Sequence, residues 1–382
     1  MNQPDILFQA NRFEHAAGAS KSRVSRFKIL AVSLMLTASS SFGAEWTLHN
    51  THGPRPSERS TPAVSAIGTQ VYLFGGVFDN FSAGVDTFYN DLFKFDALKD
   101  KWVKLRPNGP IPAARAFAAS AAQEESGRFF VFGGSSYGPD FSDFHAFDDL
   151  WVYSTGSNAW SQIHAINAGP SGRSRPALWL VGSKMYVFGG ITDSFATLND
   201  LWVYNLNSNA WTLLIADGAA GSPPSRHEAI SGSRHRFGKL VIYGGETLSE
   251  NGFEILADTW EYNIACNRWD DITPAPRHNI DPSRNFAGAG ILGGDLYLHG
   301  GDLPGGSNCC GAPFPQNVSD ELWKFDLQDG NWRQVTRFRG DSPQLKRHRG
   351  VEIGSDLFLF GGYNFVDGIG QVWNLDVFSF RP

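Results

Sequence analysis

One motif recurs six times along this sequence: an apolar run that ends in two adjacent glycines. The pairs begin at Gly75, Gly133, Gly189, Gly244, Gly300 and Gly361, after runs such as VYLF and MYVF. Successive pairs are 55 to 61 residues apart. A period of this length is typical of repeat architectures in which each unit is a small sheet.

A second segment follows each glycine pair, with a polar residue at its start and an aromatic residue two positions later. The polar residues are Asp91, Asp149, Asp200, Asp258, Glu321 and Gln371. In the first five units a tryptophan lies eleven residues after the polar residue, at Trp102, Trp160, Trp211, Trp269 and Trp332. The constant spacing predicts a strand, a turn of fixed length and the start of another strand.

Each unit also begins with an arginine, at Arg59, Arg115, Arg175, Arg226, Arg284 and Arg347. An even number of residues separates each arginine from the glycine pair. Strand side chains alternate with period two, so lengthening both arms of a hairpin by one residue keeps the same side chains facing the core. The hairpin can therefore vary in length without disturbing the sheet.

Six such units resemble the kelch repeats of β-propellers, of the type seen in the central domain of galactose oxidase. The resemblance covers Glu45 to Pro382 and predicts an all-β, six-bladed kelch β-propeller with four antiparallel strands per blade. The chain ends before the sixth unit reaches its last tryptophan, while an unmatched EWTLHN with Trp46 stands at the other end. We therefore expect the N-terminal strand to close the last blade and remove a free sheet edge.

Residues 1–44 lie outside the repeats and contain a leader-like pattern. Within 21–44, KSRVSRFKILAVSLMLTASSSFGA, basic residues precede a short apolar run and small residues. This pattern predicts a secretory signal peptide, and the twenty residues before it are expected to be a non-native extension. One hypothesis is that translation starts near Val24. The alternative to a signal peptide is a buried helix. We expect a secreted or periplasmic protein that is not inserted in a membrane after cleavage, because the run is short.

Charge and cysteine content exclude some partners. Without residues 1–44, which hold five basic and two acidic side chains, the formal net charge changes from −6 to −9. With no basic stripe in the sequence, no nucleic acid partner is expected. Cys266 stands alone, whereas the adjacent Cys309 and Cys310 form either two thiols or a strained disulfide.

The repeated tryptophans and glycines are expected to be structural, filling the wedges between blades and permitting unusual backbone angles. Six arginines near one channel mouth would repel one another, so we expect the acidic residues of the second segments to pair with them. The sixth unit has Gln371 instead of an acid and also a basic cluster, LKRHRG. This cluster, Lys346, Arg347, His348 and Arg349, is therefore the candidate for binding an anionic group, and a carboxylate partner on Arg347 would count against it.

The kelch resemblance implies that the loops before the first strand and after the glycine pair share one face, which commonly binds partners. These loops are rich in aromatic and acidic residues, which suit sugars or peptides but also simply pack a long loop. The candidate ligand-binding residues are Arg59, Arg115, Arg175, Arg226, His227, Glu246, Arg284, Asp302, Arg347, His348 and Tyr363.

Signs of catalysis or metal binding are weak. The stretch with Asp140, Asp143, His145 and Asp148 offers ligands but matches no defined loop, and no metal or other cofactor is expected. Kelch enzymes exist, such as copper radical oxidases and a periplasmic sialic acid mutarotase, but their catalytic residues have no matched positions here.

The sequence therefore predicts an exported binding propeller, more a non-catalytic module than an enzyme, with a protein or carbohydrate ligand. The alternative is a periplasmic carbohydrate-active enzyme, similar to an epimerase or mutarotase, that uses Arg, His and Glu at the same mouth. A concave cavity with a perturbed Glu or His beside an arginine would favour the enzyme; a broad aromatic face would favour the binder.

Overall fold

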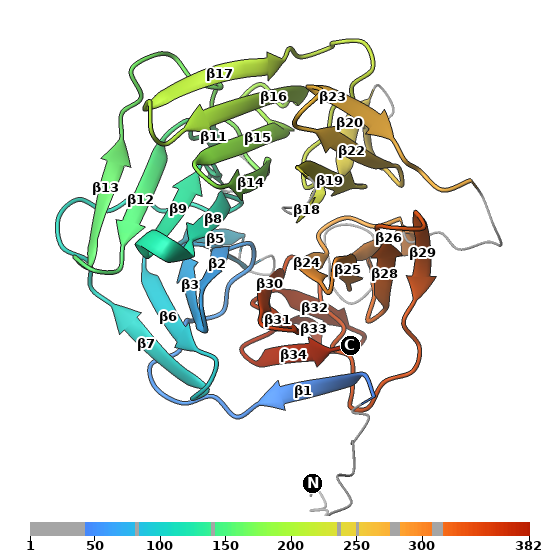
Figure 1. The fold of residues 1–382 in the computed structure, drawn as a ribbon. Coiled ribbons are helices and arrows are strands. Elements are labelled where there is room, and N and C mark those ends of the chain that lie inside the picture. Colours follow the sequence, from blue (N-terminus) through green and yellow to red (C-terminus); the bar gives the residue numbers. More distant parts are fainter. Residues whose placement is uncertain are drawn as a thin grey trace, which may run out of the picture. The chain divides into compact units, whose positions relative to one another are not determined.

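The computed structural model describes residues 43–80, 84–138, 142–234, 238–249, 252–275, 283–307 and 316–382. These residues belong to one compact unit, Phe42–Pro382, in which six antiparallel four-stranded sheets stand as blades around an axis (Figure 1). The predicted six-bladed, all-β propeller is confirmed. The proposed signal peptide, Asp140 and the Cys309–Cys310 pair lie outside the described residues.

Each blade runs from an inner strand, next to its counterparts in the neighbouring blades, to an outer strand. Blade one consists of β2 (Ala63–Ile67), β3 (Gln70–Phe74), β6 (Leu92–Asp96) and β7 (Lys101–Leu105). Blade two consists of β8 (Ala119–Gln123), β9 (Arg128–Phe132), β12 (Leu150–Ser154) and β13 (Ala159–Ile163). Blade three consists of β14 (Ala177–Val181), β15 (Lys184–Ile191), β16 (Thr197–Asn205) and β17 (Ala210–Ile215). A 3-10 turn, Glu124–Ser126, joins β8 to β9.

The last three blades follow the same order. Blade four consists of β18 (Ile230–Arg234), β19 (Lys239–Tyr243), β22 (Thr259–Asn263) and β23 (Arg268–Asp271). Blade five consists of β24 (Gly288–Leu292), β25 (Asp295–His299), β28 (Leu322–Asp326) and β29 (Asn331–Gln334). Blade six consists of β30 (Arg349–Ile353), β31 (Asp356–Phe360), β34 (Val377–Arg381) and β1 (Glu45–His49).

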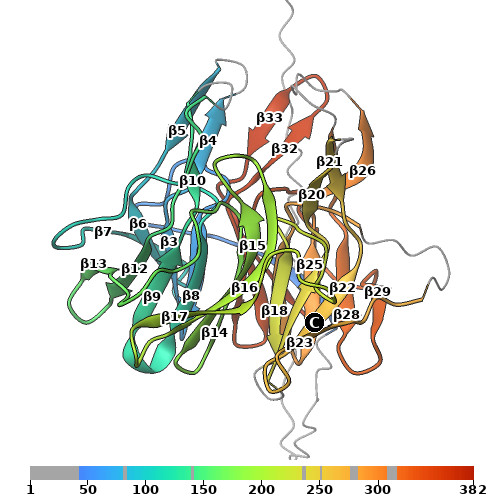
Figure 2. The same ribbon diagram turned by 90° about the horizontal axis from the view of Figure 1, so that it is seen from above.

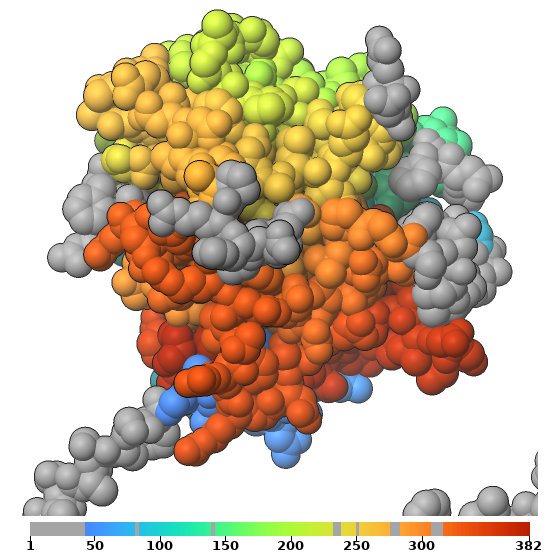
Figure 3. Space-filling view, turned by 90° about the vertical axis from the view of Figure 1, so that its right-hand side faces the viewer, coloured from blue at the N-terminus to red at the C-terminus, as the bar shows by residue number. Residues whose placement is uncertain are grey.

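The ring is closed by the N-terminal strand, as predicted. Strand β1 pairs with β34 in antiparallel register, which places Trp46 opposite Phe380. In the side view, the blue N-terminal residues lie against the orange and red surface of the last blades (Figure 3). One detail of the prediction was wrong: Gln371 does not begin the third strand of blade six. That strand is β34, and Asp376 just before it occupies the position held by Asp91 in blade one, because Val377 and Leu92 are the first residues of equivalent strands.

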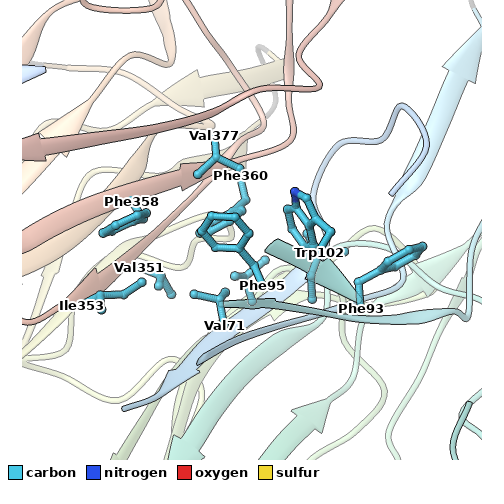
Figure 4. Close-up of a cluster of buried hydrophobic side chains, with 11 residues drawn as sticks. Val71, Phe93, Phe95, Trp102, Val351, Ile353, Phe358, Phe360 and Val377 are labelled. Atoms are coloured by element: carbon cyan, nitrogen blue, oxygen red, sulfur yellow. The ribbon is translucent and has the colours of Figure 1, made fainter. Parts of the chain in front are cut away.

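The tryptophans at the start of the outer strands fill the wedges between blades. Each contacts the aromatic ring just before the preceding blade's glycine pair, for example Trp160 with Phe74 at 5.1 Å between ring centroids. At the junction of blades six and one, Trp102 packs with Phe95 and Phe360 (Figure 4). Burial of a tryptophan at every junction explains its repetition in the sequence.

The glycine pairs permit a close approach between blades. Gly75 and Gly76 have positive φ angles of 67° and 99°, and a Cβ at Gly75 would lie 2.5 Å from the carbonyl oxygen of Arg115 in the next blade. A side chain is excluded there by both backbone angle and space. Glycine is therefore required at this position for one blade to pack closely against the next.

Beyond the glycine pairs, hairpins project on one side of the propeller (Figure 2). They are β4–β5 (Val77–Asn80, Val85–Phe88), β10–β11 (Ser135–Ser136, His145–Ala146), β20–β21 (Glu246–Ser249, Gly252–Ile255), β26–β27 (Asp302–Ser307, Gln316–Val318) and β32–β33 (Tyr363–Val366, Gly370–Trp373). In blade three the ends of β15 and β16 themselves extend to this side. We call this side the hairpin face.

Candidate functional site

Beneath the hairpin face, five blades carry the same buried ion pair between an arginine and a carboxylate. Arg59 donates from Nη1 to the carbonyl oxygen of Gly75 (2.9 Å) and to Oδ1 of Asp91 (2.6 Å). The equivalent pairs are Arg115–Asp149, Arg173–Asp200, Arg226–Asp258 and Arg284–Glu321. The expected pairing of arginines with the acidic residues is confirmed, and it ties each glycine turn to the next strand.

These pairs correct part of the predicted site. The side chains of Arg59, Arg115, Arg226 and Arg284 are at most 2% exposed, so a ligand cannot reach them. They stabilise the blades instead of forming a free cationic ring.

Two predicted arginines have a different place in the repeat. In blade three the ion-pairing residue is Arg173, not Arg175, and in blade six the equivalent position is Leu345, not Arg347. Leu345 is equivalent to the ion-pairing arginines because its main chain makes the same hydrogen bond to the preceding blade. Its carbonyl oxygen accepts from the N–H of Gly301, as the carbonyl oxygen of Arg115 accepts from the N–H of Gly76. Arg175 and Arg347 therefore stand two residues further along the chain.

Those two arginines belong to a ring of six residues, which we call the belt. Its members, one from each blade, are Thr61, Phe117, Arg175, Glu228, Phe286 and Arg347. All have positive φ angles of 50° to 60°, a conformation that costs energy in residues with a Cβ. Main-chain hydrogen bonds join neighbouring belt residues, such as Arg175 N–H to Phe117 O (2.9 Å) and Glu228 N–H to Arg175 O (3.1 Å). The belt thus links neighbouring blades at the entry to their inner strands.

Belt side chains stack as well as pair. The Arg175 guanidinium lies 4.2 Å from the ring centroid of Phe117, and that of Arg347 lies 4.8 Å from Phe286. Such cation–π contacts hold the planar groups in place while leaving their N–H groups free to donate. Arg347 also donates from Nη1 to Oδ2 of buried Asp79 (2.8 Å), so the most favoured anion-binding candidate already has a carboxylate partner.

Directly above the belt lies a second set of paired residues. The residue before each belt position forms an antiparallel bridge to the residue after the glycine pair. In blades one to three these pairs are Ser60–Val77, Ala116–Ser135 and Ser174–Ile191; in blades four to six they are His227–Glu246, Asn285–Asp302 and Lys346–Tyr363. The ionisable side chains of these pairs therefore all lie in blades four to six.

A cavity of about 580 Å³ opens over this half on the hairpin face. Its charged and polar lining consists of Arg175, Glu246, Asn285, Asp302, Lys346 and Arg347, and its apolar wall includes Phe144, Ile191, Phe195, Phe253, Ile255, Phe286, Leu303 and Pro304. A second, smaller cavity of about 150 Å³ lies among the inner strands and is also lined by Arg175. Arg175 therefore borders both cavities.

Hydrogen bonds link the polar lining from blade to blade. Asn285 Nδ2 donates to Oε1 of Glu246 (3.2 Å), and Lys346 Nζ donates to Oδ2 of Asp302 (2.7 Å). Burial lowers the pKa of Lys346 to about 8, against the opposing effect of Asp302. Burial raises the pKa of Asp79, which the nearby Arg347 and Arg175 only partly offset.

Glu246 and Arg175 are the least compensated charges in the cavity. Burial raises the pKa of Glu246, and Arg175 is the largest influence in the other direction. Among the described residues, the ion pair of Arg175 is a long one, 3.9 Å from its Nε to Oε1 of Glu228, and Glu228 also pairs with Arg349 (3.3 Å). Within the described part of the chain, the Nε of Arg175 has no hydrogen-bond partner.

The structure thus brings together Arg175, Glu246, Asp302 and Arg347 from the predicted set. His227 is fully buried behind Glu246, with Nε2 at 3.7 Å from Oε2, and Tyr363 is buried below Lys346. His348 does not belong to the site: it is buried between blades five and six, where Nε2 contacts His299 Nδ1 and the N–H of Gly288.

Sequence reasoning missed Arg173, Asn285 and most of the apolar wall, and it noted Lys346 only as part of the basic cluster LKRHRG. The signal for Arg173 was present, because a Pro or Ala follows each ion-pairing arginine by three residues, as Pro62 follows Arg59 and Pro176 follows Arg173. The cavity wall had no comparable signal, since its phenylalanines come from loops of unequal length.

Two negative findings apply to the described ranges only. Within them, no three His, Cys, Asp or Glu side chains are arranged to hold a metal ion, and Cys266 is an exposed free thiol. The described residues also form no helix long and apolar enough to cross a membrane.

Comparison with known proteins agrees with the blade geometry. The family model described as the KLHDC2/KLHL20/DRC7 Kelch-repeats domain matches residues 24–190 and 82–301. The chain belongs to the kelch-repeat family. Kelch propellers generally bind proteins, so a protein-interaction module is the class of function that this membership supports.

Several known proteins are similar over most of the chain. Kelch domain-containing protein 10 of Homo sapiens is 26% identical over 292 residues, which cover 72% of this chain and 61% of that protein. Kelch domain-containing protein 3 of Bos taurus is 26% identical over 344 residues, covering 83% and 80%. The flagellar outer-arm dynein alpha chain of Chlamydomonas reinhardtii is 25% identical over 381 residues, covering 86% of this chain but 8% of that one. The chain thus spans only part of the human protein and of the dynein chain.

A solved structure has the same fold. The structure of YjhT aligns with a TM-score of 0.61 and 19% sequence identity, covering 84% of this chain and 95% of that one. At this level of identity the likeness concerns the fold alone.

Proposed function

We propose that this propeller binds a partner protein through the hairpin face, with an apolar, acid-bearing segment of the partner seated in the cavity. The observation that carries the proposal is the cavity itself: an aromatic and aliphatic wall above a floor whose Arg175 is incompletely paired. Concave sites with an apolar wall and few polar groups are the usual form of a specific binding site.

The distribution of exposed apolar side chains supports the same face. Six large exposed hydrophobic residues belong to its hairpins and loops: Val85, Phe195, Leu248, Phe253, Ile369 and Val372. Phe195 and Phe253 also line the cavity. Gathered apolar side chains around a pocket mark interaction surfaces, because single surface hydrophobics are common but clusters are not.

Selection from a displayed peptide library tests the proposal. The immobilised full chain is expected to enrich peptides that combine an aromatic or aliphatic residue with an acidic one. Binding of the enriched peptides should fall at least tenfold in Arg175→Gln, which removes the cavity cation. Arg128→Gln is the matched control, because Arg128 is exposed at the end of β9 away from the glycine pair and should leave binding unchanged. Equal loss in both variants, or in neither, would contradict the proposed site.

A second candidate function is the carbohydrate-active enzyme with a sugar ligand. It is favoured by Glu246, a carboxyl with a raised pKa that shares a concave cavity with Arg175. The test is anomer interconversion of a panel of reducing sugars, followed by NMR with the full chain and with Glu246→Gln. Acceleration by the wild-type protein that is lost in Glu246→Gln would support the enzyme. If the wild-type protein does not accelerate the interconversion, the enzyme is contradicted and protein binding is the remaining function.

For cellular location, we propose export to the periplasm or the medium. The basic and apolar pattern in residues 21–44 supports it. N-terminal sequencing of the protein recovered from its own cells would find a start near Ala44 if the leader is removed, and Met1 if it is not.

A further inference from the structure

Two opposite charges face the same cavity without being joined to each other. Arg175 comes from the belt of blade three and Glu246 from the start of β20 in blade four. Among the described residues neither forms an ion pair with the other, and no Lys or Arg forms one with Glu246. The other charged residues of the lining are paired: Lys346 with Asp302 and Arg347 with Asp79.

The charge of the cavity therefore depends on the protonation of Glu246. Its lining and directly paired groups carry the cations Arg175, Lys346, Arg347 and Arg349 and the carboxylates Asp79, Glu228, Glu246 and Asp302. With Glu246 ionised the two sets balance. With Glu246 neutral one positive charge remains, and Arg175 is the group not held by a short ion pair.

We propose that Glu246 is the specificity-determining residue of the cavity, which accepts an amphipathic anion at Arg175 when the Glu246 carboxyl holds a proton and rejects it when the carboxyl is ionised. This inference rests on the proposed function, because it takes the cavity as the binding site. It adds a rule for the ligand: uptake of its anionic group is accompanied by uptake of one proton.

The surroundings of Glu246 fit this role. The side chain is 13% exposed, so its charge is poorly solvated, and burial raises its pKa. An anion placed on Arg175 would remove the main charge that stabilises ionised Glu246 and add a like charge nearby. Both effects favour the protonated form, and a protonated carboxyl also gains a donor O–H.

Other groups near Glu246 do not replace it as the titrating residue. Burial also raises the pKa of Asp79, but Asp79 is held by a short ion pair with Arg347 (2.8 Å), and the Glu246→Gln variant distinguishes the two carboxyls. His227, which faces Glu246 from the adjoining bridge, has a pKa held well below its usual range by burial and by Arg175. Asn285 from blade five does not titrate, and Arg347 and Arg175 stay charged. Glu228 of the belt faces Arg175 and Arg349. Lys346, with a pKa of about 8, loses its charge only at the alkaline end.

The probe for the test is anilinonaphthalene sulfonate, a fluorescent aromatic anion with a permanently charged sulfonate. Its affinity for the full chain is expected to fall, by up to about tenfold per pH unit, over the pH range in which Glu246 ionises, measured in a series of pH values below the Lys346 transition. Glu246→Gln should bind tightly throughout this range with no such slope. Arg175→Gln should bind weakly at every pH.

Glu254→Gln is the matched control, because Glu254 lies on the other strand of the same hairpin, is exposed and contacts Ser249. It should keep the wild-type slope. Should Glu246→Gln fail to fold, calorimetry of the wild type in buffers of different ionisation enthalpy gives the same answer: close to one proton taken up per bound probe near neutral pH supports the proposal.

The outcomes separate this inference from the proposed function. A wild-type slope in Glu246→Gln, or no proton uptake, overturns the role of Glu246 while loss of binding in Arg175→Gln still supports the cavity. Binding that is unchanged in Arg175→Gln, or no binding by the wild type, overturns both.

Discussion

The contact between His299 and His348 predicts that this propeller loses stability in mild acid. The two rings meet at the junction of blades five and six, with His299 Nδ1 at 3.1 Å from His348 Nε2, and both residues are fully buried. Burial, with a smaller contribution from Arg349, lowers the pKa of His348 to about 3, and burial lowers that of His299 well below its usual range. In the described structure neither ring has a carboxylate partner.

The sign and size of the effect follow from linkage. A base whose pKa is lower in the folded state binds more protons when unfolded, so its contribution to stability is complete above the unfolded pKa and is lost as the pH falls below it. With an unfolded pKa of about 6.5 and a folded value of about 3, His348 alone removes about 2 kcal/mol of unfolding free energy between about pH 7.5 and about pH 5. His299 adds to this in the same direction.

The sequence itself supplies the test variant. Where blade five has His299, the other blades have Phe74, Phe132, Phe188, Tyr243 and Phe360, and where blade six has His348 the others have Pro or Ala. In the variant His299→Phe/His348→Ala, urea unfolding followed by tryptophan fluorescence should show a loss between these two pH values that is smaller than the wild-type loss by about 2 kcal/mol or more. Equal losses in the two proteins would refute the reasoning, whatever the absolute stability of the variant.

Two further predictions concern the ring and its arginines. Trp46→Ala should lower the unfolding free energy by about 3 to 5 kcal/mol, because Trp46 is 4% exposed and packs on His299 and Phe380 at the closing strand; a change below about 1 kcal/mol, as for a surface residue, would show that β1 is not needed for closure. Arg173→Gln should cost about 3 to 5 kcal/mol by leaving buried Asp200 unpaired, whereas Lys104→Gln at a half-exposed pair should cost less than about 1 kcal/mol. The same chemical unfolding series measures both, and a similar cost for the two would argue against a structural role for the Arg173 pair.

The sequence predicted the propeller because its strongest signals are also the physical requirements of the fold. A wedge between blades needs a large ring such as Trp102, and a close approach between blades needs glycine at Gly75. A buried arginine ahead of the inner strand, such as Arg59, needs a carboxylate such as Asp91. Each requirement acts locally and recurs in every blade, so it leaves a period in the sequence. Closure by Trp46 followed from the same count.

The repeat period alone did not decide which of two nearby arginines occupies the ion-pairing position of a blade. Arg173 and Arg175 both satisfy an even spacing, and only the Pro or Ala three residues later distinguishes them. In blade six the arginine is absent, so Arg347 was aligned in place of Leu345, and Gln371 in place of Asp376.

The cavity was predicted only through single residues. Arg175, Glu246, Asp302 and Arg347 come from four blades, and their meeting depends on how the blades are rotated around the channel. The charge balance around Glu246 is a property of this assembled ring, with Asp79 reaching Arg347 across the closing junction. No local pattern in the sequence encodes it.

Hydrogen–deuterium exchange of the full chain, with and without a library-selected peptide, tests the central claim that the hairpin face is the binding surface. The account predicts slower exchange in β20–β21, in β26 and around Phe195, with no change in the turns at the opposite ends of the blades, such as Glu124–Ser126. Protection confined to those opposite turns, with none in the hairpins, would contradict it.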